Sequence, residues 1–307
     1  MLVGMSGASA QTYPTKTIRF ISPFPPGGGT DLIARMLAQN LSDNLGQQVI
    51  VDNRGGAQGN IANALAAAAP ADGYTLILSS TPTFTINPWI YKVSYDPIAD
   101  FAHISLATLQ PYVVVVNPKL SAVNLKQLAA IARAKPDTLT FGSSSAGGQL
   151  AGEFFKIISE TKMIHVPYKG AGPATTDLLG GQIDLMFSSP TGSIPHVKTG
   201  KLRALAVTAP LRIAALPDVP SSRESGFPEL EMNTWYGVAA PARTPQSTIV
   251  KLNSEIARIL SNSSLKERLA TGGLDARSNT PAEMTALVKA DYDRWGKVVK
   301  ASGMKAE

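Results

Sequence analysis

The sequence predicts an α/β protein made of two β/α lobes joined by two hinge strands. Residues 17–78 read as strand, helix, strand, helix, strand, the order of a parallel sheet with helices on its faces. A second series of alternating strands and helices follows residue 117. Two apolar strands lie where the chain would cross between the series, and two crossings predict a hinged clamshell.

The first series of strands and helices is predicted from the spacing of its hydrophobic residues. Ile33, Leu37 and Leu41 repeat at helical intervals, and Gly46 is placed to end that helix. The expected strands are 17–21, 48–51 and 74–78, and the expected helices are 31–45 and 60–69.

The second series begins with an apolar, β-branched run at 112–116, which predicts a buried strand. Asn117-Pro118 would stop it. The elements expected after it are helices at 125–134, 149–159 and from 175, and strands at 139–141, 163–167, 183–187 and 202–207.

The two crossings divide the chain. We expect them at the strands 112–117 and 235–241, which places the first lobe at 11–115 and 236–307 and the second at 116–235. The remaining residues, 1–10, read as the residual tail of a signal peptide.

The N-terminus predicts export. Residues 1–7 are short, apolar and small, and Ala8-Ser9-Ala10 fits an A-x-A cleavage pattern. We therefore expect a mature protein that begins near Gln11 and works in the periplasm; a vector remnant is the alternative. No later apolar stretch reaches the roughly 18 residues needed to span a bilayer, so direct membrane insertion is not expected.

Three helix starts are predicted near the C-terminus. Thr244-Pro245 supplies an N-cap followed by a proline at the first helical position. Ser264 with Glu267 is typical of a capping box. Residues 280–283 have both a proline after the N-cap and the spacing of a capping box.

The composition is that of an ordinary globular protein. The 307 residues carry a net charge of +6, with 44% hydrophobic and 16% charged residues and no cysteine. Disulfides and thiolate sites are therefore excluded. The basic residues are scattered, so we expect a dispersed surface charge and no nucleic-acid partner.

Two glycine-rich turns predict the binding site. Residues 25–31 and 142–148 each connect a strand to a helix and would expose backbone N–H groups at a helix N-terminus. Such an end favours an anion through both its free donors and its dipole. Two of them in separate lobes predict a cleft that holds an anionic small molecule from both sides.

Other motifs do not reach the patterns of known catalytic or cofactor sites. The first turn lacks the Gly-Lys-Ser/Thr of a Walker A loop, and Ala146 stands where a nucleophile elbow needs glycine. His103, His165 and His196 have no metal-ligand spacing, so neither a metal nor another cofactor is expected.

Several motifs together resemble one family along the chain from about residue 13 onwards. The motifs are Phe24-Pro25-Pro26-Gly27-Gly28 with Asp31, Asn53-Arg54 with Gly56 and Gly59, Asp72-Gly73-Tyr74, Pro167-Tyr168-Lys169-Gly170, the stretch 177–184, Leu216-Pro217-Asp218-Val219-Pro220, and Trp235-Tyr236-Gly237. The chain resembles the Bug family, the periplasmic solute-binding proteins of tripartite tricarboxylate transporters. The resemblance implies a type II periplasmic-binding-protein fold that captures small carboxylates and delivers them to a membrane transporter.

The resemblance also implies which residues form the site. The first-lobe half would be the turn Pro25–Gly29, with Pro26, Gly27, Gly28 and Gly29, and Asp31. The segment Ser79–Thr83, with Ser79, Ser80 and Thr83, would line it. The second-lobe half would be Ser143, Ser144, Ser145, Gly147 and Gly148, with Tyr168 and Phe187 as walls. Gln149 departs from the family pattern, because many members carry a histidine there.

Three interpretations stay open for these residues. Phe24, Phe84, Tyr168 and Phe187 would make a flat apolar pocket for an aromatic acid, although each alone also fits a core position. Asp31 would either meet the ligand or satisfy backbone donors at the start of its helix. Arg54 fits a structural ion pair better than a ligand contact.

We therefore expect a monomeric, non-enzymatic periplasmic binding protein for a small carboxylate. Two opposed helix N-termini favour a dicarboxylate, and the aromatic walls suggest terephthalate or a related aromatic acid. One alternative is a sensory module that presents its ligand to a receptor kinase, and another is a serine hydrolase that uses Ser144.

Overall fold

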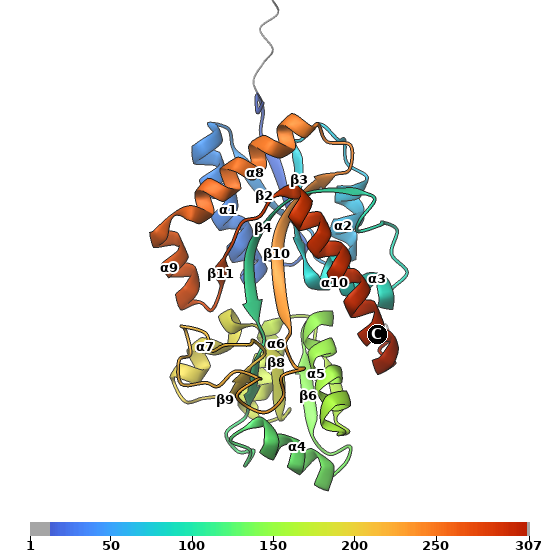
Figure 1. Cartoon of the computed structure of the whole chain (residues 1–307), viewed down its shortest axis with the longest axis vertical. Coiled ribbons are helices and arrows are strands. Elements are labelled where there is room, and N and C mark those ends of the chain that lie inside the picture. The colour runs from blue at the N-terminus through green and yellow to red at the C-terminus, as the bar shows by residue number, and fades with distance from the viewer. Residues whose placement is uncertain (1–12, 306–307) are drawn as a thin grey trace, which may run out of the picture.

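Two lobes, each built on its own sheet, form the protein. The computed structural model describes residues 13–305, so the expected signal-peptide tail at 1–10 lies outside the described residues. In Figure 1 the first lobe lies above and the second below; β4 runs down toward the lower lobe and β10 runs back up beside it. The α/β fold with two lobes is confirmed.

The first lobe contains a six-stranded sheet in the order β11-β4-β10-β3-β1-β2. Its elements are β1 (Ile18–Ser22), α1 (Gly29–Leu45), β2 (Val49–Asn53), α2 (Asn60–Ala67), β3 (Thr75–Ser80), the π-helical turn η2 (Pro82–Ile86), α3 (Asn87–Ile90), β4 (Phe101–Pro111), β10 (Asn233–Pro241), α8 (Gln246–Ser261), α9 (Ser263–Thr271), β11 (Asp275–Ala276) and α10 (Pro281–Ser302). Strands β1, β2 and β3 are parallel, as expected, and β10 runs antiparallel to β3 and β4.

The second lobe contains a five-stranded sheet in the order β7-β6-β8-β5-β9. Its elements are β5 (Val113–Val116), α4 (Leu125–Ala134), β6 (Thr140–Ser143), α5 (Ala146–Ser159), β7 (Ile164–Pro167), α6 (Ala171–Gly180), β8 (Leu185–Ser188), α7 (Pro190–Lys198) and β9 (Arg203–Val207). Strand β5 pairs on both sides, with β8 and β9. Val114 and Val116 enter one core and Val113 and Val115 the other, which explains the uninterrupted apolar run.

The lobes meet at two short connections. One lies between β4, which ends at Pro111, and β5, which begins at Val113; the other lies just before Asn233, where β10 begins. The expected boundaries after residues 115 and 235 therefore fall inside β5 and β10. Residues 113–115 pair in the second sheet and residues 233–235 in the first, because each strand keeps a continuous ladder with its neighbours.

Two elements near the cleft have no counterpart among the sequence expectations. Strand β4 mixes small polar and apolar residues, yet nearly all of them are buried in the first sheet. Helix α7 begins with Pro190 directly after β8 and carries a second proline, Pro195, inside. Neither has the long apolar periodicity that predicts an element from sequence.

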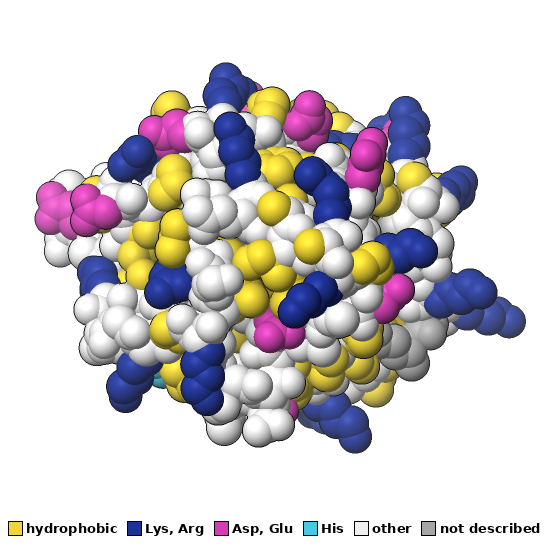
Figure 2. Space-filling view, turned by 90° about the horizontal axis from the view of Figure 1, so that it is seen from below, with side chains coloured by type: hydrophobic (Ala, Val, Ile, Leu, Met, Phe, Trp, Pro, Cys, Tyr) yellow, Lys and Arg dark blue, Asp and Glu magenta, His cyan; other side chains and the backbone are white. Residues whose placement is uncertain are grey.

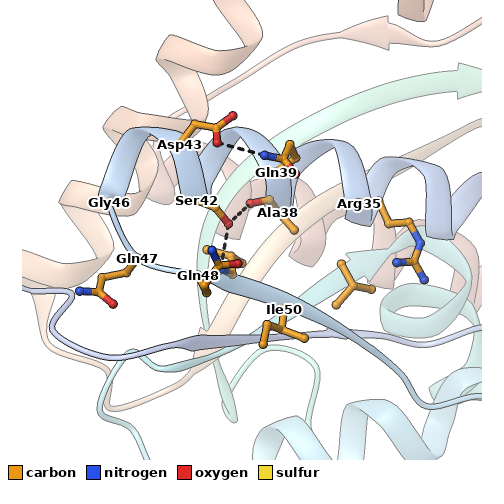
Figure 3. Close-up of a pocket in the computed structure, with 11 residues that line it drawn as sticks. Arg35, Ala38, Gln39, Ser42, Asp43, Gly46, Gln47, Gln48 and Ile50 are labelled. Carbon is orange, nitrogen blue, oxygen red and sulfur yellow. Dashed lines mark hydrogen bonds between the residues drawn. The ribbon is translucent and has the colours of Figure 1, made fainter.

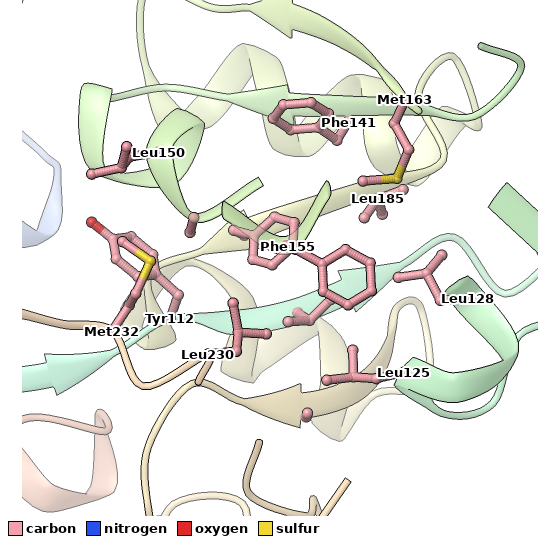
Figure 4. Packing of buried hydrophobic residues seen from close by; sticks show 14 of the residues in the cluster. Tyr112, Leu125, Leu128, Phe141, Leu150, Phe155, Met163, Leu185, Leu230 and Met232 are labelled. Atoms are coloured by element: carbon pink, nitrogen blue, oxygen red, sulfur yellow. The ribbon is translucent and has the colours of Figure 1, made fainter. Parts of the chain in front are cut away.

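The C-terminal helix joins the two lobes on one side of the molecule. Trp295 is 1% exposed on α10 and belongs to the core cluster of the second lobe, together with Val299 and Met304. Figure 4 shows other members of this cluster, including Leu150 and Phe155 of α5. The first lobe therefore contributes α10 to the core of the second.

The helix starts follow the sequence only in part. Thr280 and Glu283 form the expected capping box of α10. The N-cap of α9 is Asn262, whose side chain accepts from Leu265 N, so the box expected at Ser264 is wrong. Helix α8 starts one residue later than expected, with Pro245 at its N-cap, and the Thr244 hydroxyl donates to Pro241 O instead.

Candidate functional site

The first expected turn does start a helix at the edge of the lobe interface. Gly28 is the N-cap of α1, and a Cβ at Gly27 or Gly28 would meet nothing within 4 Å. Gly27 has a φ of 90°, which favours glycine. This backbone is therefore open to close approach by another molecule.

Asp31 holds this turn in place. Its Oδ2 accepts from Gly27 N at 3.1 Å and from Arg35 Nε at 2.9 Å, and its Oδ1 accepts from Asn53 Nδ2 at 3.0 Å. These hydrogen bonds and the Arg35 charge outweigh burial and hold the pKa of the Asp31 carboxyl below its ordinary value. Of the two interpretations, the structure favours the structural one, because both carboxylate oxygens already have donors.

The second expected turn also starts a helix. The Ser145 hydroxyl accepts from Gly148 N at 3.3 Å and caps α5. Gly147 permits a close approach: a Cβ there would lie 3.3 Å from Pro82 Cγ and would collide with the Tyr112 hydroxyl. The N-terminus of α5 therefore lies against η2 of the first lobe and against the connection between the lobes.

Two tyrosines at the hinge lie between these helix ends. Tyr236 of β10 accepts from Thr30 Oγ1, in the first turn of α1, at 3.4 Å. Tyr112 follows β4, and its hydroxyl lies beside Gly147 of α5. Burial, followed by the nearby Tyr236, raises the pKa of Tyr112, and burial also raises the pKa of Tyr236. Both phenols therefore keep their protons and can donate hydrogen bonds.

The hinge tyrosines were not among the sequence-predicted site residues. The sequence signal was their position on the two expected hinge strands, Tyr112 in 112–117 and Tyr236 in 235–241. Their role depends on which face of each strand turns toward α1 and α5, and that is set by strand pairing.

A third group of small residues lies on the opposite edge of the interface. Ser188 ends β8, and Ser189 precedes α7, with its hydroxyl 3.3 Å from Thr191 Oγ1. A Cβ at Gly29 would lie 2.8 Å from Thr191 Oγ1, and one at Gly273 would lie 2.5 Å from Pro190 Cβ. The start of α7 therefore packs against the start of α1 and the loop before β11. A strand that ends in Ser188-Ser189-Pro190 and leads into a helix was the missed sequence signal.

Two of the four expected aromatic walls are core residues. Phe84 is 0% exposed and packs on Phe101 at 4.8 Å between ring centroids. Phe187 is 2% exposed and packs on Phe155 at 5.9 Å. Both rings therefore lack a free face for a ligand, because neighbouring strands and helices cover them.

The other two aromatic residues are half-buried. Phe24 precedes the first turn, and its backbone oxygen accepts from Asn53 Nδ2 at 2.9 Å. The Tyr168 hydroxyl donates to Asp177 Oδ2 at 2.8 Å, and burial together with this carboxylate raises the pKa of Tyr168 to about 12. They remain candidates for an apolar wall.

The expected lining segment 79–84 is buried. Ser80 Oγ and Thr83 Oγ1 lie 3.1 Å apart and hydrogen-bond to each other. Ser79 is 0% exposed and lies on the other face of β3, beside Gly237. Because strand neighbours point to opposite faces, Ser79 and Ser80 cannot line the same wall.

The serine that contacts a histidine is Ser143, and not the Ser144 of the hydrolase alternative. Ser143 Oγ, at the end of β6, lies 2.7 Å from Nε2 of His165 within the neighbouring strand β7. Burial and the charge of Lys156 lower the pKa of His165 to about 4, so this imidazole is neutral near pH 7. Within residues 13–305 there is no cluster of three or more His, Asp or Glu side chains that could hold a metal ion.

Arg54 forms the structural ion pair that the sequence favoured. Its Nε lies 2.9 Å from Asp52 Oδ1, and Arg19 binds the same carboxylate. Lys and Arg side chains are spread over the face in Figure 2, with Asp and Glu among them, as expected for a dispersed surface charge.

The molecule also has a surface groove of about 610 Å³ between α1 and β2. Its lining includes Gln39, Ser42, Asp43 and Gln48, and Figure 3 shows that it lies along α1 and the start of β2. This groove is made by one lobe only and contains neither glycine turn, so it is separate from the candidate site.

The fold and the convergence of two helix N-termini between lobes define a two-lobed solute-binding protein. Ligands of open α/β sheets bind at the carboxyl ends of the strands, where these turns lie. Residues 33–304 match the family described as tripartite tricarboxylate transporter family receptor, and the chain belongs to this family.

Three proteins are similar to the chain over nearly its whole length. Protein BugT of Bordetella pertussis is 38% identical over 301 residues, which cover 97% of this chain and 92% of BugT. The structure of R. palustris Rpa4515 with adipate has a TM-score of 0.91 and 34% identity, and covers 95% of this chain and 99% of that one. MatC of Rhodopseudomonas palustris with bound malate has a TM-score of 0.86 and 29% identity, with coverages of 94% and 100%.

These comparisons confirm the resemblance to the Bug family. The family is one of transporter receptors, and a further similar structure is that of the periplasmic binding protein BugD, so the chain is a solute-binding protein and not an enzyme. Over the described part of the chain, none of the helices combines the length and apolar character of a membrane span.

Proposed function

We propose that the chain captures a small dicarboxylate between its lobes, in the periplasm, and delivers it to the membrane components of a tripartite tricarboxylate transporter. One carboxylate would meet the N-terminus of α1 at residues 27–30, and the other the N-terminus of α5 at residues 144–148. The observation that carries this proposal is the placement of Tyr236 beside Thr30 and of Tyr112 beside Gly147. It supports one site shared by both helix ends.

Two similar proteins of known structure support the same ligand class. The two similar structures hold adipate and malate, which are both aliphatic dicarboxylates. The burial of Phe84 and Phe187 weakens the aromatic alternative, because it removes half of the expected flat pocket. Phe24 and Tyr168 are still candidates for an apolar wall, so terephthalate is included among the acids to be tested.

The test is a thermal-shift screen followed by calorimetry on the mature chain. Succinate, malate, adipate and terephthalate are compared with acetate and benzoate as single-carboxylate controls. A ligand at a hundred times its dissociation constant stabilises the folded state by about 2.7 kcal/mol, which raises Tm by a few degrees. Shifts with diacids and none with monoacids would support the proposal. Binding no tighter than millimolar for every diacid would overturn it.

Delivery is tested separately. Reconstituted transporter subunits should take up the labelled diacid only when the loaded protein is present. Ligand-dependent capture of a receptor-kinase ectodomain, without any uptake, would favour the sensory alternative instead.

A further inference from the structure

One face of the paired strands β4 and β10 carries a group of polar residues at the hinge. Gln110 lies opposite Thr234, and Thr108 lies opposite Tyr236. Residues paired across an antiparallel ladder point to the same side of the sheet. These four side chains therefore share the face on which Tyr236 meets Thr30 of α1.

Three oxygens of this group are buried without a partner. Among residues 13–305, Gln110 Oε1, Thr234 Oγ1 and Thr108 Oγ1 accept or donate no hydrogen bond. Gln110 and Thr234 are each 3% exposed, and Thr108 is 0% exposed. A buried polar atom left unpaired costs free energy, and three on one face call for a common cause.

The Gln110 amide has one end without a partner. Its Oε1 is buried and unpaired, so it is left as an acceptor. The Thr234 hydroxyl is also buried and unpaired, and Thr234 lies directly opposite Gln110 in the strand ladder.

We propose that Gln110 and Thr234 bind a hydroxyl group on the ligand. The protein then prefers a hydroxy-dicarboxylate over the plain diacid of equal length. This inference rests on the proposed function, since the two carboxylates occupy the helix N-termini. The hydroxyl then reaches the hinge strands between them, donating to Gln110 Oε1 and accepting from the Thr234 hydroxyl.

The charge of the site favours a hydroxyl over an ammonium group as the donor. An ammonium needs an anionic partner when it is buried. Asp31 is the carboxylate beside the α1 turn, and its two oxygens are already bound to Gly27, Arg35 and Asn53. The side chains of Gln110 and Thr234 are neutral, so they match the neutral hydroxyl of a ligand better than an ammonium group.

The test measures the affinities of the mature wild-type chain for malate, succinate and aspartate by calorimetry. These four-carbon diacids differ only in a hydroxyl, a hydrogen or an ammonium; 2-hydroxyadipate, adipate and 2-aminoadipate repeat the comparison with six carbons. We expect the hydroxy acid to bind about tenfold more tightly than the plain diacid, because its hydroxyl exchanges hydrogen bonds with water for the two hydrogen bonds to Gln110 and Thr234. The amino acid should bind no better than the plain diacid.

Two variants test whether Gln110 and Thr234 cause the preference for the hydroxy acid. Gln110→Met and Thr234→Val keep the side-chain volume and should each lower the affinity for the hydroxy acid about tenfold, while leaving the plain diacid within about twofold. Gln39→Met, on an exposed face of α1, is the matched control and should change neither affinity. Thermal unfolding of each variant checks that it is folded.

The outcomes separate the two proposals. Equal binding of hydroxy and plain diacids, or a preference that survives both variants, overturns this inference and leaves the proposed function standing. A preference for the amino acid overturns the choice of a hydroxyl. If no diacid binds the wild-type chain, the proposed function fails and this inference fails with it.

Discussion

Gly29 at the start of α1 and Thr191 at the start of α7 touch across the two lobes. A Cβ at Gly29 would lie 2.8 Å from Thr191 Oγ1, closer than carbon and oxygen approach without one of them shifting. The neighbouring pair is tighter still, since a Cβ at Gly273 would lie 2.5 Å from Pro190 Cβ. This edge of the interface therefore requires small residues on the first lobe.

Replacing Gly29 with alanine should oppose closure of the lobes. Moving the Thr191 side chain aside costs roughly 1 kcal/mol, so we expect diacid affinity to fall about fivefold while Tm changes little. Calorimetry measures the affinity, and small-angle scattering should show a larger radius of gyration for the loaded variant than for the loaded wild type.

Gly180→Ala, at the exposed end of α6, is the matched control, because a Cβ there meets only Gln182 Cγ at 4.0 Å and Gly180 is not part of the site. The double variant Gly29→Ala with Thr191→Ala should recover most of the lost affinity. An affinity loss as large in Gly180→Ala as in Gly29→Ala would contradict a steric origin.

Trp295→Ala should destabilise the second lobe although α10 starts in the first. Trp295 is 1% exposed within the core that contains Leu150 and Phe155. Truncation of a buried tryptophan costs about 3–5 kcal/mol, which denaturant unfolding would measure. Hydrogen exchange should rise in α5 as well as in α10. Lys297→Ala, two residues further along α10 and exposed, should be nearly neutral. Protection of α5 that is unchanged in Trp295→Ala would argue against the shared core.

Asp31→Ala should weaken ligand binding through the turn rather than by direct contact. The variant leaves Gly27 N and Asn53 without their acceptor, and hydrogen bonds to a charged group are worth about 1.5–3 kcal/mol. We expect a lower Tm and a lower affinity for every diacid by a similar factor. Asp43→Ala, on the exposed end of α1, serves as the control, and selective loss of one diacid would point to a direct contact instead.

The stability of the protein should fall between about pH 6.5 and pH 4 because of His103. Burial lowers the pKa of His103 to about 4, while its Nε2 hydrogen-bonds Pro97 O at 3.0 Å. In this range the unfolded chain binds a proton that the folded chain excludes, so stability decreases as the pH falls and levels off below the folded pKa. The full effect is on the order of 3 kcal/mol.

Thermal unfolding of the wild type and of His103→Gln across this pH range measures that contribution. The variant should be less stable near pH 7 but should lose less on acidification. His165, whose pKa is also lowered to about 4, contributes in the same direction and leaves a residual slope. An identical slope in both proteins would rule out His103 as the source.

The sequence determined the parts that depend on local pattern. Hydrophobic periodicity and turn chemistry gave the alternating strands and helices, the buried run at Val113–Val116 and the capping box at Thr280. The two glycine turns were recognised because their residue types permit close backbone approach, whatever packs around them. The motif order was specific enough to indicate the family.

Tertiary structure decided everything that depends on which faces meet. It placed Phe84 and Phe187 in cores, because aromatic side chains carry no local signal that separates a core from a ligand wall. It brought Thr30, Gly147, Tyr112 and Tyr236 together through strand pairing at the hinge, and it set Thr191 against Gly29. These contacts join residues that are distant in sequence, so only the pairing and packing of the whole chain could specify them.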